Sequence, residues 1–369
     1  MPNWFKPKFL TKMEIDRPYL ISVLKNSITN IETSEDKSVL NSILTSFEHR
    51  DFSLLSSQEI HFLKNSREDI WSDYLIFRYK FNIYPKLHIV SDFPNYVSIE
   101  PVSACNLRCV MCYQSDESFT KDQNLMGMMN IDLFKKIIDE ISSSGTKAIT
   151  LASRGEPTLH PHLGEMLEYC SGKFLEIKVN TNATKLTEKL IHKILKSEIT
   201  DIVFSIDSYT KENYEQIRLK AIFEEVLNNI KKFKEIKEEF YPNSKIATRV
   251  SGVQVDEKQD PELFKNFWEK HVDHVVMVPM SPWWDTYNNS TDIAGKDTCG
   301  FLWQRMNIWY DGKCNPCDTD YKSTLSVGDF NNNSIKEIWH SKKYTEIRNA
   351  HLTKNRQNCF PCDRCPFEN

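Results

Sequence analysis

Three cysteines at C-x3-C-x2-C spacing, Cys105, Cys109 and Cys112, follow the apolar stretch Tyr96-Val-Ser-Ile-Glu100. Soft thiolates this close together suit an iron–sulfur cluster, which normally takes four cysteine ligands. Because the loop offers only three, one iron would be left for a ligand that is not protein. A zinc site, the alternative, needs a fourth cysteine or histidine nearby. No other cysteine or histidine lies between His88 and His160, so the spacing favours an iron–sulfur cluster.

The composition of the whole chain limits its class. The 369 residues are 40% hydrophobic and 27% charged, with a net charge of −4. This indicates a globular cytoplasmic protein with no nucleic-acid surface. No signal-peptide core or membrane-spanning apolar run is apparent, so we expect no membrane partner. Disulfides rarely persist in the cytoplasm, so the ten cysteines are expected to serve mainly as metal ligands.

Hydrophobic periodicity divides the chain into three parts. Residues 1–95 predict a helical region, in which Ser66 is expected to cap a helix. Residues 96–285 alternate between strand and helix patterns, which predicts βα units around a parallel sheet. Their expected strands cover 97–100, 148–152, 175–179, 201–207, 246–255 and 274–278. Residues 286–369 form a cysteine-rich C-terminal domain.

Polar residues stand at the carboxyl ends of these strands, where α/β proteins place their functional groups. Arg154-Gly155-Glu156-Pro157 follows the second strand, Ser205 and Asp207 close the fourth, and Arg249 lies on the fifth. An alternative remains open, in which Asp207 caps the next helix and Arg218 and Arg249 form structural ion pairs. Cys170 falls on the apolar face of its helix and is expected to be a buried core thiol.

The C-terminal domain contains the remaining cysteine clusters. Cys299 opens a predicted β-hairpin that turns at Asp311-Gly312, and Cys359, Cys362 and Cys365 close the chain. A closed site of four thiolates suits either zinc or an iron–sulfur cluster.

The loop of Cys105, Cys109 and Cys112 resembles that of the radical S-adenosylmethionine (radical SAM) enzymes. The resemblance implies an α/β fold with a partial (β/α)6 barrel and a [4Fe-4S] cluster on these three catalytic cysteines. S-adenosylmethionine chelates the open iron in that family, and its reductive cleavage yields a 5′-deoxyadenosyl radical. An external electron donor such as flavodoxin or ferredoxin is also implied.

The same resemblance implies a set of cofactor-binding residues. Arg154-Gly-Glu-Pro157 resembles the family's Gly-Gly-Glu-Pro motif, in which Gly155 and Glu156 would bind the amino group of S-adenosylmethionine. Arg154 departs from that motif. Ser205, with Asp207 in the same motif, would contact the ribose or carboxylate region, Arg249 would pair with the carboxylate, and Tyr113 or Met111 would contact adenine.

The segment from Cys299 onward resembles the SPASM/twitch domains that follow radical SAM barrels. It has six cysteines rather than the seven of the full SPASM pattern, so one auxiliary [4Fe-4S] cluster is expected. Its preferred ligands are Cys299, Cys317, Cys362 and Cys365. Cys359 is a possible replacement for Cys365, and Cys314 a possible ligand or hydrogen-atom donor.

These resemblances imply a radical SAM oxidoreductase, either a dehydrogenase or an epimerase. The favoured substrate is a polar small molecule of the carbohydrate or aminocyclitol type, oxidised with the help of the auxiliary cluster. Trp283-Trp284-Asp285 is a candidate for sugar binding, or else packs between the domains. A peptide-modifying or epimerising enzyme is the alternative function. A non-catalytic zinc or iron–sulfur protein, structural or interacting, is the alternative of another class.

Overall fold

The computed structural model describes residues 15–367. The described chain forms two compact units, one ending at Ser91 and the other beginning at Asp92. Within this part of the chain, no helix is both long enough and apolar enough to cross a bilayer.

The first unit is helical, as its periodicity predicts. Its helices are α1 (Arg17–Ser27), α2 (Ser34–Glu48), α3 (Ser57–Asn65) and α4 (Trp71–Leu87). The expected cap at Ser66 is wrong, because Ser66 follows the end of α3 and α4 begins without a side-chain cap. The capping box instead belongs to Ser56 and Glu59 at the start of α3, where each side chain accepts from the backbone N–H of the other residue.

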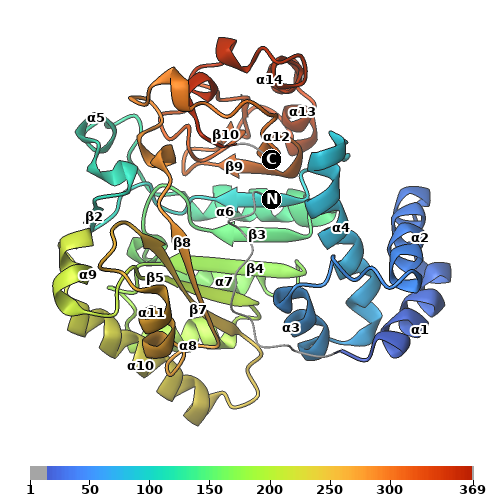
Figure 1. Cartoon of the computed structure of the whole chain (residues 1–369), viewed down its shortest axis with the longest axis horizontal. Helices are drawn as coiled ribbons and strands as arrows, with labels where there is room; N and C mark the ends of the chain where they lie inside the picture. The colour runs from blue at the N-terminus through green and yellow to red at the C-terminus, as the bar shows by residue number, and fades with distance from the viewer. Residues whose placement is uncertain (1–14, 368–369) are drawn as a thin grey trace. The chain divides into compact units, whose positions relative to one another are not determined.

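The second unit is built on a nine-stranded sheet in the order β11-β10-β9-β1-β3-β4-β5-β7-β8 (Figure 1). The six consecutive parallel strands from β1 to β8 are those of the predicted (β/α)6 barrel, so this fold prediction is confirmed. They are β1 (Tyr96–Ile99), β3 (Ala148–Leu151), β4 (Glu176–Thr181), β5 (Asp201–Ser205), β7 (Ala247–Gln254) and β8 (His274–Pro279).

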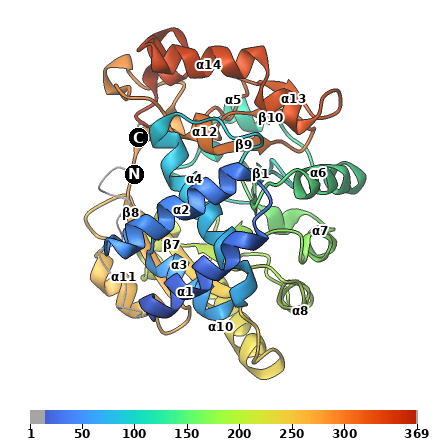
Figure 2. The ribbon, with the colours of Figure 1, turned by 90° about the vertical axis from the view of Figure 1, so that its right-hand side faces the viewer.

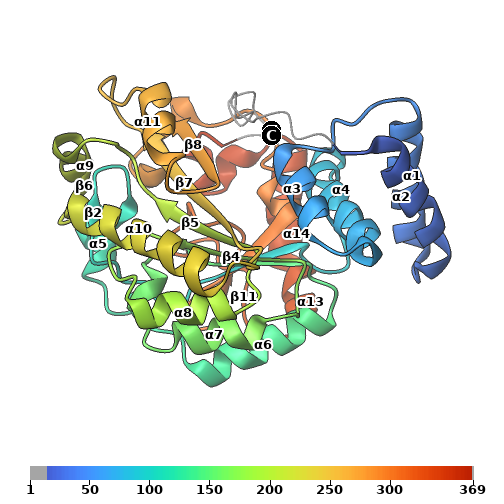
Figure 3. The same cartoon turned by 90° about the horizontal axis from the view of Figure 1, so that it is seen from below.

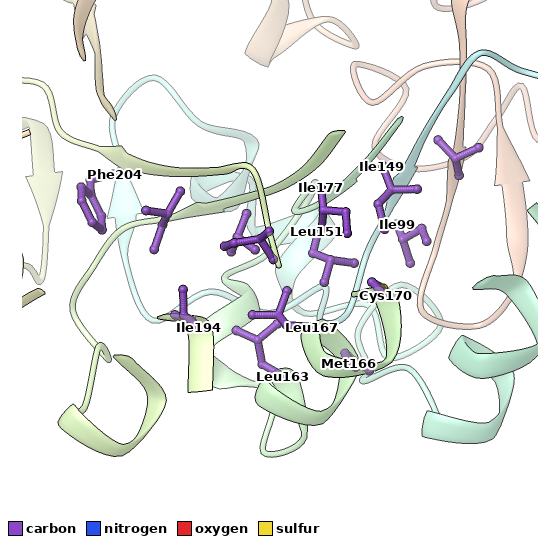
Figure 4. Packing of buried hydrophobic residues seen from close by; sticks show 14 of the residues in the cluster. Ile99, Ile149, Leu151, Leu163, Met166, Leu167, Cys170, Ile177, Ile194 and Phe204 are labelled. Atoms are coloured by element: carbon purple, nitrogen blue, oxygen red, sulfur yellow. The ribbon is translucent and has the colours of Figure 1, made fainter. Parts of the chain in front are cut away.

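Helices cover the outer side of these strands, as Figure 3 shows for α6, α7, α8 and α10. The helices of this part are α5 (Glu117–Thr120), α6 (Ile131–Ser143), α7 (Leu163–Cys170), α8 (Glu188–Lys196), α9 (Lys211–Ile217), α10 (Phe223–Phe240) and α11 (Pro261–Trp268). Strand residues such as Ile149 and Ile177 meet helix residues such as Leu167 and Cys170 in one core (Figure 4). Cys170 is fully buried there, which confirms its predicted core role.

The opposite face of the same strands is largely polar, because successive side chains of a strand point to opposite faces. Residues that alternate with the core positions include Ser98, Glu100, Thr150, Lys178, Asn180, Ser205, Arg249 and Ser251. The inner face of the strands therefore presents hydrogen-bonding groups.

Local sequence signals set several helix ends. Gly145 adopts a φ of +98° just after the C-cap of α6, a conformation that glycine enters without steric cost. Thr187 caps α8 by accepting from the Leu190 N–H, and Asp260 caps α11 ahead of Pro261. All three ends agree with the sequence patterns.

The C-terminal segment continues the barrel sheet. It contains α12 (Phe301–Gln304), β9 (Arg305–Ile308), β10 (Lys313–Asn315), β11 (Gly328–Asp329), α13 (Ile335–Trp339) and α14 (Lys342–Leu352). Strands β9 and β10 form the predicted hairpin, and β9 also pairs parallel with β1 (Figure 2). The sequence did not predict this pairing, which makes the hairpin part of the same sheet as the barrel.

A buried ion pair lies where β1, β3 and the hairpin meet. Arg154, just after β3, binds Glu100 at the end of β1 through two contacts of 2.6 Å. Its third nitrogen donates to the Tyr321 carbonyl at 2.9 Å, and its guanidinium lies 4.3 Å from the Trp309 ring centroid. Arg154, which stands where the Gly-Gly-Glu-Pro motif has its first glycine, therefore links the barrel to the C-terminal domain.

We expect Arg154→Met to lower the free energy of unfolding by about 3–5 kcal/mol, because it leaves the Glu100 carboxylate buried without its partner. Urea denaturation measures this. Lys121→Met is the matched control, since it breaks an exposed pair with Glu117 that is worth about 1 kcal/mol or less. Equal losses in the two variants would contradict the role of the buried pair.

Candidate active site and cofactor centres

The three-cysteine loop is fixed at its middle by a second small sheet. Strand β2 (Arg108–Cys109) pairs antiparallel with β6 (Arg218–Leu219), and the Val110 N–H donates to the Ile217 carbonyl at 3.0 Å. The loop thus follows β1 at its start and is paired with the segment after α9 at its middle. This pairing gives the middle of the loop a defined backbone.

Nitrogen donors lie near two of the three sulfurs of this loop. Cys105 Sγ accepts from the Leu107 N–H at 3.4 Å and from the Asn182 amide at 3.7 Å. Arg218 Nη1 lies 3.9 Å from Cys109 Sγ. Such donors stabilise thiolates and the sulfurs of an iron–sulfur cluster, so the residues present fit this cofactor.

Burial keeps the thiols protonated while no cofactor is bound. It raises the pKa of Cys105 to about 11 and that of Cys112 to about 12. Cluster binding must therefore release protons. Within residues 15–367, no three histidine, cysteine or acidic side chains converge as ligands of one metal ion would.

Gly155 lies directly against the backbone of the cysteine loop. A Cβ atom at this position would sit 2.2 Å from the Val102 carbonyl oxygen and 2.4 Å from that of Ala104. The next residue, Glu156, donates its N–H to the Ala104 carbonyl at 3.0 Å. Only glycine permits this approach, which positions the turn after β3 beside the loop that leads to Cys105.

Glu156 is buried and already bonded to the end of β4. Its Oε1 accepts from the Thr158 N–H at 3.0 Å and from the hydroxyls of Thr158 and Thr181 at 2.6 and 2.7 Å. Its Oε2 accepts from the Asn182 N–H at 2.7 Å. Burial raises the pKa of Glu156, and these donors offset part of that effect. Oε2 retains capacity for one further donor, as an ammonium group requires.

The alternative that Asp207 caps the next helix is wrong, because the N-cap residue of α9 is Thr210 and no side chain caps that helix. Asp207 is instead the partner of Arg218 in the structural ion pair that the sequence left open for Arg218. Its Oδ2 lies 2.6 Å from Arg218 Nε, and its Oδ1 accepts from the Val253 N–H at 2.8 Å. The pair is buried and extends to Cys109 through Arg218. Ser205, two residues before Asp207, is part-buried at the end of β5. Cofactor contacts by Ser205 and Asp207 stay predictions.

Arg249 points its charge toward the opposite end of the strands. Its Nη2 lies 4.0 Å from Asp201 Oδ1, and Asp201 begins β5. This contact is the structural ion pair that the sequence left open as the alternative role of Arg249. Pairing of Arg249 with the carboxylate of S-adenosylmethionine remains a prediction.

Tyr113, directly after the third cysteine, is buried between the barrel and the C-terminal domain. Its ring stacks on Tyr321 at a centroid distance of 4.7 Å, and its hydroxyl donates to the Ser153 carbonyl at 3.0 Å. Met111, its alternative as an adenine contact, belongs to the main core. Contact of Tyr113 or Met111 with adenine therefore stays a prediction.

The C-terminal cysteines gather around one small cavity. Its walls include four of them, namely Cys299, Cys317, Cys362 and Cys365. Cys314 is buried away from this cavity, with its sulfur 3.6 Å from the Gly312 carbonyl oxygen, and Cys359 does not line the cavity either. Burial raises the pKa of Cys299 to about 11, so these thiols too are protonated until a cofactor binds.

The Trp283-Trp284-Asp285 segment forms a 3-10 turn, Pro282–Asp285. The two tryptophan side chains lie outside the described part of the structure, so the sugar-stacking prediction stays open. The Asp285 carboxylate accepts from the Asn288 amide at 2.7 Å.

Comparison with protein families accounts for both cysteine centres. Residues 99–274 match the family model described as the radical SAM superfamily. Residues 299–366 match the model of an iron–sulfur cluster-binding domain, SPASM. The chain therefore contains a radical SAM domain followed by a SPASM domain. Its cofactors are accordingly a [4Fe-4S] cluster with S-adenosylmethionine, and the SPASM domain adds iron–sulfur binding.

Individual proteins resemble this chain in sequence or in fold. The chain is 26% identical to the tungsten-containing aldehyde ferredoxin oxidoreductase cofactor-modifying protein of Pyrococcus furiosus, over 74% of this chain and 89% of that protein. SuiB of Streptococcus suis, crystallised with the precursor peptide SuiA, has a similar fold (TM-score 0.58, 14% identity, 87% of this chain and 86% of SuiB). BtrN, crystallised with AdoMet and 2-DOIA, gives a TM-score of 0.51 at 17% identity, over 75% of this chain and 93% of BtrN.

Sequence reasoning missed two contacts to the cluster loop, one from Asn182 and one from Arg218, which it considered only for a structural ion pair. Asn182 reaches both Cys105 and Asn106, the latter at 3.0 Å, and Arg218 reaches Cys109. Asn182 stands at a strand end, which is the signal that marks it as a candidate. Arg218 lies in the short strand β6, and its approach to Cys109 depends on a pairing across 109 residues.

We expect Gly155→Ala to displace the cysteine loop, because the new Cβ meets backbone oxygens that cannot move independently. The variant should retain less iron at this loop and bind S-adenosylmethionine more weakly, as iron analysis and equilibrium binding measure. Gly164→Ala is the control, because its Cβ meets only the flexible side chain of Lys193, with Cδ at 2.3 Å. Unchanged binding by Gly155→Ala would contradict the argument from close approach.

Proposed function

We propose that this protein is a radical SAM oxidoreductase that removes a hydrogen atom from a polar substrate, with an auxiliary [4Fe-4S] cluster accepting the electron of the following oxidation. The observation that carries the proposal is the presence of two separate cysteine centres, three cysteines in the loop after β1 and four around the C-terminal cavity, in two regions that one continuous sheet joins. When bound, the first cluster and S-adenosylmethionine supply a 5′-deoxyadenosyl radical. The substrate loses two hydrogens overall, as a hydrogen atom followed by an electron and a proton.

Each group of residues has a proposed task. Cys105, Cys109 and Cys112 hold the first cluster, with Asn182 and Arg218 donating toward its sulfurs. Glu156 holds the amino group of S-adenosylmethionine through its free capacity at Oε2, and Gly155 sets the distance between this turn and the loop. Ser205 contacts the ribose or carboxylate region. The apolar core behind the strands and the buried aromatic contact of Tyr113 keep water from the loop.

The auxiliary cluster is proposed to have four protein ligands, Cys299, Cys317, Cys362 and Cys365. The first two come from the segments on either side of β9 and β10, and the last two from the terminal C-x2-C. Their common position on one cavity supports this set over one that includes Cys314 or Cys359. With four thiolates no iron stays open, so this cluster would accept electrons rather than bind S-adenosylmethionine.

The favoured substrate class is a carbohydrate or aminocyclitol. The polar inner face of the barrel supports it, with hydroxyl, amide and cationic side chains that suit a polyhydroxylated ligand. Domain boundaries near residues 95 and 285 are proposed as well, with the helical region serving a separate role from the barrel.

Peptide modification is the second candidate function. The fold shared with SuiB, whose structure contains a precursor peptide, favours it. Incubation with candidate aminocyclitols and with a short peptide encoded beside this protein distinguishes the two, with mass loss of two hydrogens as the readout.

The assignment predicts that anaerobically reconstituted protein, given dithionite and S-adenosylmethionine, releases 5′-deoxyadenosine. The combined variant Cys105→Ala, Cys109→Ala, Cys112→Ala should abolish release because it removes every protein ligand of the first cluster. Chromatography of the nucleoside products measures this. The variant should keep the auxiliary iron. Release of 5′-deoxyadenosine equal to that of the wild type would contradict the proposal.

The auxiliary ligand set predicts a contrast between two neighbouring cysteines. Cys317→Ala should lower bound iron by about one cluster, while cleavage to 5′-deoxyadenosine persists without substrate turnover. Cys314→Ala is the matched control and should keep the iron, because its sulfur lies away from the cavity. Iron analysis decides between them, and the reverse pattern would show that the ligands are misassigned. An accumulating substrate radical in Cys314→Ala would indicate hydrogen donation by Cys314 and an epimerase.

A further inference from the structure

His351, at the end of α14, lines the same cavity as the four cysteines. The residue is only 3% exposed. It lies 52 positions after Cys299 in the chain, and the sequence patterns did not single it out. Its ring is therefore an ionisable group placed within the cavity wall.

The hydrogen bonding of the ring determines its tautomer. The backbone N–H of Cys299 donates to His351 Nδ1 at 3.3 Å. Since a backbone N–H is only a donor, Nδ1 must be the acceptor, and a neutral ring then carries its proton on Nε2.

Nε2–H has no hydrogen-bond partner among the described residues, although the atom is buried. A buried donor without an acceptor costs about 1–3 kcal/mol. Neither polar side chain of the cavity accepts from Nε2: Arg356 is only a donor and donates to three carbonyls, and the Thr319 hydroxyl lies 3.1 Å from Cys317 Sγ. The rest of the wall consists of apolar side chains and the four cysteines. Sulfur is therefore the acceptor that the cavity offers to this donor.

We propose that His351 Nε2–H donates a hydrogen bond to a sulfur of the auxiliary cluster, either a cysteine thiolate or an inorganic sulfide, and so raises its reduction potential. The inference rests on the proposed four-cysteine ligand set. A reduced cluster carries one more negative charge than an oxidised one, so a donor stabilises the reduced form more. His351 is thus a positioning and tuning residue rather than a ligand, and it would make the cluster a better acceptor of the substrate's electron.

The test uses the full chain with Cys105, Cys109 and Cys112 changed to alanine, so that only the auxiliary cluster contributes. His351→Leu removes the donor, and His351→Gln replaces it with an amide N–H. We expect all three proteins to bind the same amount of iron. At a fixed applied potential, the ratio of reduced to oxidised cluster should fall on the order of tenfold in His351→Leu, which is 59 mV for a one-electron couple, and less in His351→Gln.

Pulsed electron paramagnetic resonance of the reduced cluster in deuterated water gives a second readout. An exchangeable deuteron coupled to the cluster should be lost in His351→Leu and kept in His351→Gln. His340→Leu is the control, because His340 is exposed and its Nε2 lies 3.0 Å from the Asp92 carbonyl oxygen. It should change neither the potential nor the coupling.

An unchanged potential or an unchanged coupling in His351→Leu would overturn the proposal. Loss of iron in both His351 variants would also overturn it, because His351 would then be a ligand or a structural support. If only His351→Leu loses iron, a coupling and potential retained by His351→Gln support the donor role, and their loss refutes it. Absence of iron from the parent triple variant would instead refute the four-cysteine site itself.

Discussion

The ion pair between Glu100 and Arg154 is the interaction on which the arrangement of this protein depends. Both side chains are almost completely excluded from water, at 0% and 1% exposure, so their charges had to be compensated within the protein. Arg154 does this with two contacts to Glu100, a third to a C-terminal carbonyl and a position over Trp309. Glu100 also accepts from the Tyr310 N–H at 3.3 Å. Because all of these groups must stay together, the ends of β1 and β3 and the C-terminal hairpin have one relative arrangement.

The contacts at this junction also position the cysteine loop. It leaves β1 just after Glu100, and Gly155 follows Arg154, so the same pair that joins the strands also brings the glycine against the loop. The β2–β6 pairing fixes the far side of the loop. A cofactor site built in this way loses little conformational entropy on binding, because its backbone is already held from two sides.

The two cysteine centres differ in how their donors are organised. The barrel loop offers three cysteines from one short segment, with a cation, Arg218, directed at one of them by a buried aspartate. The C-terminal cavity collects four cysteines from distant segments and places a neutral imidazole beside them. A centre with an open position suits substrate-like binding, whereas a closed one suits electron transfer.

The sequence by itself determined the six parallel strands, their helices and the two cysteine groups, because periodicity, capping residues and ligand spacing are local properties. The tertiary structure decided how distant residues meet. The pairing of β9 with β1 depends on backbone hydrogen bonds, which carry no side-chain signature. The alternatives for Asp207 and Arg249 depended on side-chain direction. Asp207 pairs with Arg218 and does not cap the next helix, and Arg249 pairs with Asp201. Arg154 and Glu100 are 54 residues apart, and His351 and Cys299 are 52 apart. Such pairs become neighbours only when the chain folds, since burial and long-range packing, not spacing, select their partners.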